Sequence, residues 1–500
     1  MIKKRNFYLL IFLFIIVFAV KLYFALNVPY LSDEKSYFAL RQAEYIKDNG
    51  FVKYEDELSY GGREYFFLPL MHYIIAFFLF FFEPMCAIKI FTNFFSSLLI
   101  FPIFLIVKQI TKNENVALLS SFLASFIPIY IYETINTASI YSIIVPLSVY
   151  LMYFFLKINI KKKPMLFIFL LLIFIFTSPF VIIILLGIIF YFIISWIEKF
   201  KIQKAEIELL VFSIFLTGFT YLIFYKDALI MHGPSIIYGN IPKEFLIKYF
   251  NDINLNTILI GLGILPLIGL IAIAYIFLTN KKKKTFFLPF AILCACSILL
   301  ILKLIPFTLG LIYLGVLFVI LFGEGFVYII NYFKKTKFSK FIFIFYFLLL
   351  ILFLFTSIIP SFLMVKDALD NSTEKEIING FKKIQNETNE NFTIIWDIEK
   401  GHLINYFANK KNFADTNYLF IDDLDIRLND IKTLYTSAII TKAIKIMQKY
   451  DAKYLVFDET IKSRYNITKI SYINDDCFSE FYIKDEIKIY KRECNLVLKK

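Results

Sequence analysis

Cysteine is scarce in this sequence, which has only five among 500 residues. Cys294 and Cys296 are separated by one residue, which is not the usual spacing of a zinc or redox motif. With Cys86 they lie in or beside apolar stretches, so we expect all three to pack as small apolar side chains. Cys477 and Cys494 flank a predicted hairpin in a polar C-terminal region. An oxidising compartment would allow a disulfide between them, and the sequence leaves the bonded and the unbonded pair open.

Two other features are missing. Lys3, Lys4 and Arg5 precede the first apolar run, residues 7–26, but no small-residue cleavage site follows it. We therefore expect an uncleaved anchor with a cytoplasmic N-terminus rather than a removed signal peptide. The sequence also lacks paired inverted repeats and ionisable residues in the middle of its apolar stretches, which argues against a transporter.

Apolar residues make up 59% of the chain, 62 of them phenylalanine, and the mean hydropathy is +0.70. Repeated stretches near the ~20 residues that cross a bilayer predict a polytopic α-helical membrane protein. The net charge is +13, but the lysines cluster in short breaks between the apolar stretches, where they set membrane topology. We therefore interpret the positive charge as a topology signal and expect no nucleic-acid binding.

The spacing of these breaks predicts the number of spans. The breaks are residues 108–112, 157–163, 199–204, 281–284 and 334–340. Two apolar stretches separate each break from the next, so all the breaks lie in the cytoplasm with the N-terminus only if residues 66–82 do not cross the membrane. This predicts about eleven spans, with the C-terminus and residues 27–69 outside. The predicted spans are residues 7–26, 90–107, 116–132, 139–156, two within 165–196, 209–225, 257–278, 286–302, 306–330 and 341–359.

A polar loop, residues 27–69, follows the first span directly and is the strongest functional candidate. It contains Asp33 and Glu34, a second acidic cluster at residues 55–57, and Arg63 after two glycines. Carboxylates at a bilayer boundary are costly to place there without a use. The Asp33–Glu34 pair could act as a general base or bind a divalent cation that offsets a phosphate leaving group. The alternative is that the pair only caps an interfacial helix over residues 35–47.

The composition changes abruptly near residue 366, which divides the chain in two. Residues 1–365 form the predicted membrane domain, and residues 366–500 the predicted soluble, extracytoplasmic α/β domain. The second part has helix-like periodicity at 374–385 and 431–449 and strand-like runs at 393–396, 454–458 and 481–490. Asn-x-Ser/Thr sites are compatible with its exposure outside and begin at Asn371, Asn386, Asn391 and Asn466.

The first loop resembles that of the GT-C superfamily of glycosyltransferases, which use polyprenyl-phosphate sugars, and most closely the aminoarabinose and protein-mannosyl transferase group. The resemblance implies that Asp33 is the catalytic residue, with Glu34 beside it and Tyr37 in the substrate site. That group has a lysine-proline-proline run where this chain has FLP, so Arg63 is the candidate contact for the donor phosphate. The matching motifs are DExxY at residues 33–37, RxAExIxxxGF at 41–51 and GGREYFFLPL at 61–70.

The C-terminal region resembles a related branch, the outer domain of oligosaccharyltransferase catalytic subunits, including the archaeal AglB type. The similar stretches are residues 394–417 and 437–459. In that family a WWDYG signature recognises the Ser or Thr of the acceptor sequon. The resemblance therefore implies that Trp396, Asp397 and His402 bind the acceptor; the full set of matching residues is Trp396, Asp397, Gly401, His402 and Asp415. The alternative is that Trp396 is an ordinary strand aromatic in the soluble core and His402 a polar group at a helix start.

A divalent cation, Mg²⁺ or Mn²⁺, is the cofactor that these resemblances imply. The second acidic motif of the family should lie between the third and fourth spans, where residues 133–139 offer Glu133 alone. Asp33 and Glu133 are therefore the candidate metal ligands.

Together these observations predict a membrane glycosyltransferase that moves a sugar from a polyprenyl-phosphate-linked donor to a glycan, lipid or protein acceptor on the outer face of the cell membrane. One alternative is an oligosaccharyltransferase that acts on protein asparagine; another is a non-catalytic relative or a transporter. Residues 398–400 are inserted between Asp397 and Gly401. This insertion displaces Gly401 and His402 from the family geometry, which favours a glycan or lipid acceptor.

Overall fold

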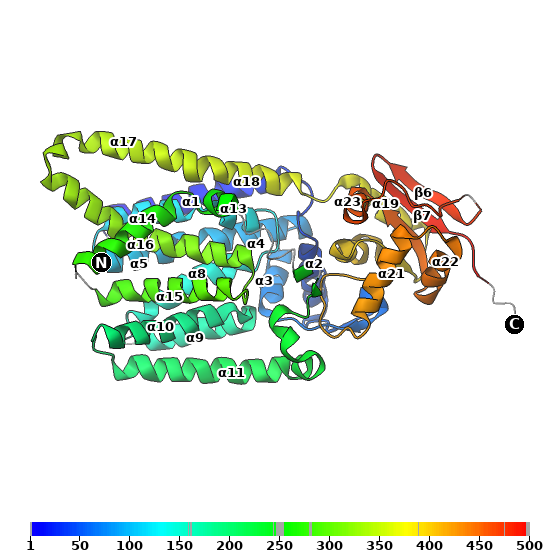
Figure 1. Ribbon diagram of the computed structural model, residues 1–500, viewed down its shortest axis with the longest axis horizontal. Coiled ribbons are helices and arrows are strands. Elements are labelled where there is room, and N and C mark those ends of the chain that lie inside the picture. Colours follow the sequence, from blue (N-terminus) through cyan, green and yellow to red (C-terminus); the bar gives the residue numbers. More distant parts are fainter. Residues whose placement is uncertain are drawn as a thin grey trace.

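The structure, a computed structural model, describes residues 3–158, 160, 163–243, 245–246, 255–279, 283–388, 390–474 and 476–496. It has two parts, a long bundle of apolar helices and a smaller α/β domain at one end of the bundle (Figure 1). The N-terminus lies at the other end of the bundle. The predicted fold class, a polytopic helical membrane protein with a C-terminal α/β domain, is confirmed.

Each predicted span corresponds to one helix or to two consecutive helices. In the described ranges, seven helical segments are long and apolar enough to cross a membrane, or eight with the bent pair α6 (Glu114–Ala124) and α7 (Pro128–Thr134). Three further predicted spans, α8 (Tyr141–Phe155), α9 (Lys163–Thr177) and α14 (Leu265–Thr279), have 15 residues each. The other helices of the bundle are α1 (Lys4–Leu26), α4 (Pro84–Ser97), α5 (Ile100–Thr111), α10 (Ile182–Ile197), α11 (Lys204–His232), α13 (Leu255–Leu262), α15 (Lys284–Ile301), α16 (Phe307–Lys335), α17 (Ile342–Phe353) and α18 (Ile359–Asp370).

The apolar stretch at residues 66–82 forms only the ten-residue helix α3 (Leu70–Leu79). At ~1.5 Å per residue this helix measures roughly 15 Å, about half of a hydrocarbon core. It packs against α2 (Glu34–Asn49) and α4 at the end of the bundle that meets the α/β domain (Figure 1). The length of α3 therefore supports the expectation that this stretch does not span.

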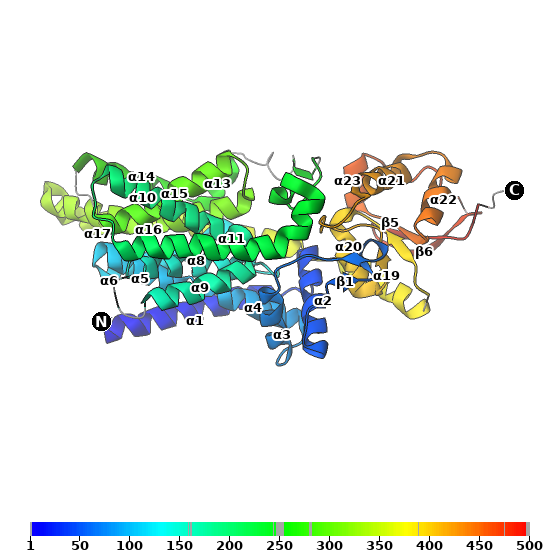
Figure 2. The same ribbon diagram turned by 90° about the horizontal axis from the view of Figure 1, so that it is seen from below.

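Lysine-bearing breaks contact the N-terminal segment and one another. Glu114 accepts a hydrogen bond from the Lys3 backbone nitrogen at 3.3 Å and pairs with Lys108 at 2.6 Å. Lys284 donates a hydrogen bond to the Lys201 carbonyl at 2.9 Å, which joins two later breaks, and it also pairs with Glu206 of α11 at 2.9 Å. Figure 2 shows α5 and α6, which border the first break, at the N-terminal end of the bundle. This arrangement agrees with the parity argument, and the compartment that this end faces stays a prediction.

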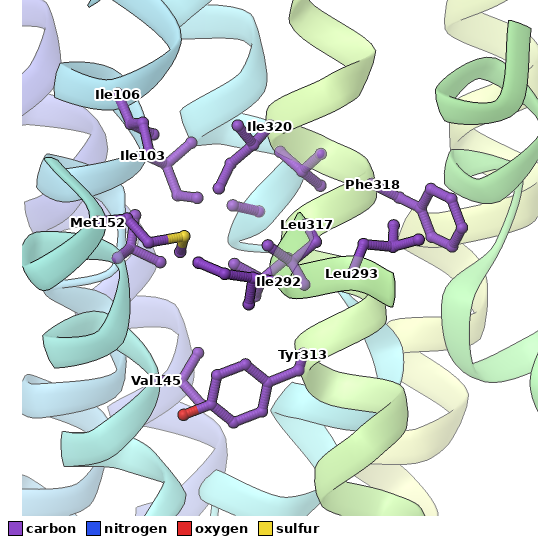
Figure 3. Packing of buried hydrophobic residues seen from close by; sticks show 14 of the residues in the cluster. Ile103, Ile106, Val145, Met152, Ile292, Leu293, Tyr313, Leu317, Phe318 and Ile320 are labelled. Carbon is purple, nitrogen blue, oxygen red and sulfur yellow. The ribbon is translucent and has the colours of Figure 1, made fainter. Parts of the chain in front are cut away.

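The core of the bundle lies where four helices meet. Because lipid tails are as apolar as leucine, close packing rather than escape from water holds such a core together. The hydroxyl groups of Ser148 and Tyr313 form a polar contact across this core at 2.6 Å. Figure 3 shows buried side chains of α5, α8, α15 and α16 in this cluster: Ile103, Ile106, Val145, Met152, Ile292, Leu293, Tyr313, Leu317, Phe318 and Ile320.

The α/β domain is built on a five-stranded mixed sheet in the order β4-β3-β5-β7-β6. β3 (Thr393–Ile395) runs parallel to β4 (Lys411–Asn412) and to β5 (Ala452–Phe457). β7 (Ile487–Arg492) is antiparallel to both β5 and β6 (Phe478–Lys484). The segment after β3 leads into α20 (Gly401–Leu403), which lies at the junction with the bundle (Figure 2). The remaining helices of the domain are α19 (Lys375–Glu387), α21 (Leu424–Thr436), α22 (Ile440–Lys449) and α23 (Glu459–Tyr465).

Two predicted elements of this domain differ from the structure. The helix predicted at residues 431–449 is two helices, α21 and α22, because the backbone of Ser437 is extended and its hydroxyl accepts a hydrogen bond from the Ile439 nitrogen at 3.0 Å. The hairpin predicted between Cys477 and Cys494 is present as β6–β7, but the strand-like run predicted at 481–490 is interrupted by its turn, which contains Asp485 with a φ of 52°. The disulfide that the sequence left open is formed between Cys477 and Cys494, whose Cα atoms are 4.8 Å apart, and it closes this hairpin.

Candidate functional site

The first loop, residues 27–69, folds into α2, two short strands and α3, and Asp33 stands at the start of α2. Its side chain accepts a hydrogen bond from the Lys35 nitrogen at 3.3 Å, so the predicted helix cap is present. Burial raises the pKa of the Asp33 carboxyl, and the nearby charges of Lys35 and Lys400 act in the opposite direction. A capping carboxylate keeps free lone pairs, so capping and a chemical role are compatible.

Glu133 lies in the last turn of α7, and the fold brings it near Asp33. The two carboxylates are close enough for their charges to repel each other, and Lys35 attracts both. Asn136 fixes this approach, because its side chain donates a hydrogen bond to the Ser32 hydroxyl at 2.7 Å and its carbonyl accepts one from the Ser32 nitrogen at 3.1 Å. Two candidate ligands from distant parts of the sequence are therefore neighbours.

These two carboxylates do not make a complete metal site by themselves. Within the described ranges, no group of three or more His, Cys, Asp or Glu side chains is arranged to hold a metal ion. Mg²⁺, however, is commonly bound by one or two carboxylates, with substrate phosphates and waters completing its coordination. Asp33 and Glu133 are the two residues that would hold such a cation, with a phosphate-bearing ligand and waters completing its coordination.

Glu34 contacts the α/β domain rather than open solvent. It is 8% exposed, and its carboxyl oxygens accept hydrogen bonds from the His402 backbone nitrogen, at 3.1 Å, and from the Thr416 hydroxyl. Burial raises the pKa of Glu34 to about 8. The negative charges of Asp415 and Asp33 also raise this pKa, whereas the hydrogen bond from Thr416 lowers it. The Glu34 carboxyl is therefore largely neutral at neutral pH.

Tyr37, a predicted substrate contact, is fully buried. Its hydroxyl accepts a hydrogen bond from the Leu31 nitrogen at 3.0 Å and donates to the Thr373 hydroxyl at 3.2 Å. Its ring lies edge-on to that of Phe407, with the centroids 5.1 Å apart. In this structure Tyr37 ties α2 to the segment before it and to the C-terminal part of the chain, and it does not face an open site.

Arg63, predicted to contact the donor phosphate, is also engaged within the protein. Its guanidinium pairs with Asp415 at 3.0 Å, and the two side chains are 5% and 0% exposed. The remaining guanidinium nitrogens donate to the Ser59 hydroxyl at 2.8 Å and the Asn417 carbonyl at 2.6 Å. The structure therefore places Arg63 in a buried joint between the first loop and the α/β domain, where protein groups already engage its guanidinium.

Trp396 and Asp397, two predicted acceptor contacts, lie inside the domain. Trp396 is 1% exposed and packs against Phe381 with the ring centroids 5.4 Å apart. Asp397 accepts a hydrogen bond from the Glu399 nitrogen at 2.8 Å and pairs with Arg464 at 2.9 Å. Burial raises the pKa of Asp397 to about 6, although the charge of Arg464 opposes this. A peptide cannot reach either side chain in this conformation.

His402 lies at the junction of the two domains. Burial lowers its pKa to about 4, so the ring is neutral near pH 7, and it packs against Phe38 of α2 with the centroids 5.1 Å apart. Gly401 allows this position, because a Cβ there would approach the Ala414 carbonyl oxygen to 2.1 Å. Only glycine lets these two segments lie so close together.

The sequence prediction missed Lys35, Lys400 and Thr416. Lys35 belongs to α2, and Lys400 ends the short 3₁₀ helix Ile398–Lys400; their charges act on Asp33. A signal for each lysine was present, since Lys35 lies inside the DExxY motif and Lys400 within the insertion after Asp397. Thr416 had no such signal, because its role depends on a contact with α2 across 382 residues of sequence.

No family model matches the sequence, and no curated protein matches it. Solved structures match it in fold. The Archaeoglobus fulgidus oligosaccharyltransferase tethered with an acceptor peptide containing the NVT sequon has a TM-score of 0.65 and 13% identity, over 89% of this chain and 69% of that chain. The archaeal AglB in complex with an inhibitory peptide and a dolichol-phosphate has a TM-score of 0.62 and 14% identity over the same shares.

ArnT from Cupriavidus metallidurans bound to undecaprenyl phosphate matches over 96% of this chain and 97% of that chain, with a TM-score of 0.56 and 9% identity. At such identities the likeness establishes the fold alone. The fold implied by both sequence resemblances, that of the GT-C glycosyltransferases, is confirmed.

Proposed function

We propose that this chain is a membrane glycosyltransferase that transfers a sugar from a polyprenyl-phosphate-linked donor to an acceptor on the outer face of the membrane. The observation that carries the proposal is the position of Asp33, at the end of the bundle beside Glu133, Lys35 and Lys400. In the same fold, AglB binds a dolichol-phosphate and ArnT binds undecaprenyl phosphate. An anionic lipid carrier suits the cationic side chains around Asp33.

In the proposed reaction, an acceptor hydroxyl or amide nitrogen attacks the anomeric carbon of the donor sugar. The bond from that carbon to the phosphate oxygen breaks, and the phosphate leaves with the bonding electrons. The proton of the acceptor passes to the Asp33 carboxylate. Because burial raises the pKa of Asp33, its carboxylate is a stronger base than one in open solvent.

Lys35 and Lys400 take the role predicted for Arg63, because Arg63 is already engaged in a buried ion pair with Asp415. Their ammonium groups stabilise the charge that develops on the leaving phosphate. A Mg²⁺ or Mn²⁺ ion held by Asp33 and Glu133 would add Lewis-acid stabilisation at the same phosphate.

The test is transfer of a labelled sugar from a polyprenyl-phosphate donor by the purified protein. Asp33→Asn keeps the size of the side chain and removes its charge, so transfer should fall by roughly two orders of magnitude or more. The matched control is Glu57→Gln, because Glu57 is an exposed acid in the same loop and should be dispensable. Full activity of Asp33→Asn would show that another residue accepts the proton of the acceptor.

Transfer to protein asparagine is the second candidate, favoured by the likeness to the AglB that carries an acceptor peptide. We favour a glycan or lipid acceptor, because Trp396, Asp397 and His402 are buried and present no surface to a peptide. Sequon peptides should then be inert as acceptors. Transfer to a sequon peptide, with loss of transfer when the Thr of the sequon is replaced by Ala, would establish the second candidate instead. A site built to hydrogen-bond a hydroxyl strongly rejects a peptide that lacks this hydroxyl.

A further inference from the structure

Glu34 follows Asp33 in the chain, yet its hydrogen bonds lead into the other domain. One carboxyl oxygen accepts from the His402 nitrogen at 3.1 Å and the other from the Thr416 hydroxyl. Both partners belong to the α/β domain and lie more than 360 residues away in the sequence. The first turn of α2, which carries Asp33, is thereby joined directly to that domain.

The partners of this carboxyl group are themselves held in place. Gly401 packs so closely against Ala414 that a Cβ would come within 2.1 Å of the Ala414 carbonyl oxygen, so the neighbouring amide of His402 has little room to move. Thr416 directly follows Asp415, whose carboxylate is fixed by its buried pair with Arg63 at 3.0 Å. The anchor for the start of α2 is therefore rigid.

We propose that Glu34 is a positioning residue, whose two hydrogen bonds to the α/β domain hold the first turn of α2 and keep Asp33 beside Glu133 and Lys400. The inference rests on the proposed function, in which Asp33 accepts the proton of the acceptor. A loosened first turn would displace that carboxylate from the reacting atoms, and a shift of ~1 Å can cost about a hundredfold in rate.

The first experiment removes the anchor without touching α2. Thr416→Val deletes the hydroxyl and keeps the shape, so kcat should fall by roughly tenfold or more, with the donor KM within about threefold of wild type. Thr416→Ser restores a hydroxyl and should restore kcat. The matched control is Tyr406→Phe, which removes a 2.9 Å hydrogen bond between the same domain and Glu44, far along α2 from Asp33. This control should leave kcat unchanged, and an equal fall there would overturn the inference.

The second experiment separates positioning from chemistry at Glu34 itself. In Glu34→Gln the amide oxygen can accept from the His402 nitrogen, and the amide nitrogen can donate to the Thr416 hydroxyl, so kcat at pH 7 should stay within about threefold of wild type. Loss of activity as severe as in Asp33→Asn would show that Glu34 takes part in the chemistry.

A third measurement tests the anchor independently of any activity. Spin labels at Lys47 of α2 and Lys442 of α22, both exposed, report the distance between α2 and the α/β domain. The distance distribution should broaden in Thr416→Val and stay narrow in Thr416→Ser. A narrow distribution in Thr416→Val would overturn the inference even if the protein is a transferase, whereas broadening in a protein without transfer activity would overturn only the proposed function.

Discussion

Charged residues near the start of α2 fall into two groups with different surroundings. Asp33, Glu133 and Lys35 keep partial or full solvent exposure and interact through their charges. Arg63 and Asp415 are buried and pair with each other across 352 residues of sequence. A single sequence identifies carboxylates at a membrane boundary, because hydropathy reveals the boundary. It does not reveal that Arg63 has a buried partner, because Asp415 lies in the other domain.

The buried Arg63–Asp415 pair should matter for stability. Removing one member of such a pair leaves a buried charge without compensation, which costs about 3–5 kcal/mol. Arg63→Met and Asp415→Leu should each lower the midpoint of thermal inactivation in detergent, and the double variant should lower it by less than the sum of the two. The control is Lys204→Ala, because Lys204 and Glu208 form an exposed pair, 91% and 64% exposed, which should contribute little. Additive effects of the two single variants would contradict this account.

At the scale of elements, the strength of the periodic signal decided what could be predicted. The apolar helices and α2 were predicted because each carries a long hydrophobic run or a capping acid followed by a helical pattern. The division of residues 431–449 into α21 and α22 was missed, because a local hydrogen bond of Ser437 interrupts a pattern that looks continuous. The hairpin between Cys477 and Cys494 was predicted, but the position of its turn was not, since Asp485 interrupts only briefly a run of strand-forming residues.

The close contact of α20 with residues 414–415 gives a prediction at this scale. Gly401→Ala places a Cβ against backbone that cannot swing aside, so we expect overpacking that costs about 1–3 kcal/mol. The displaced His402 amide should also loosen its hydrogen bond to Glu34, so kcat should fall together with stability. Gly218→Ala in α11 is the control, because nothing lies within 4 Å of its Cβ position. Thermal inactivation and sugar transfer, measured on both variants, test the prediction; equal behaviour of the two would contradict it.

At the scale of the whole molecule, the first loop and the α/β domain close over the same end of the bundle (Figures 1 and 2). The two-part architecture was predictable, because composition separates apolar from polar segments. The interlocking of the two parts was not, since it depends on contacts such as those of Glu34 and Arg63 with residues 402–417, which no local pattern encodes. The sequence therefore predicted the carboxylates of the candidate site, but it did not predict the residues that hold these carboxylates in place.

The membrane orientation gives the last prediction. Because the lysine-bearing breaks lie with the N-terminus, that end should face the cytoplasm and the α/β domain should lie outside. Single cysteines at Glu57 in the first loop and at Lys375 at the start of α19, both exposed, should react with a membrane-impermeant thiol reagent in intact cells. A cysteine at the exposed Lys334, near the end of α16, should react only after permeabilisation. The chain without an added cysteine is the control for labelling of its native cysteines. Labelling of Lys334→Cys in intact cells, with protection of the other two positions, would reverse the topology and place the proposed transfer on the cytoplasmic face.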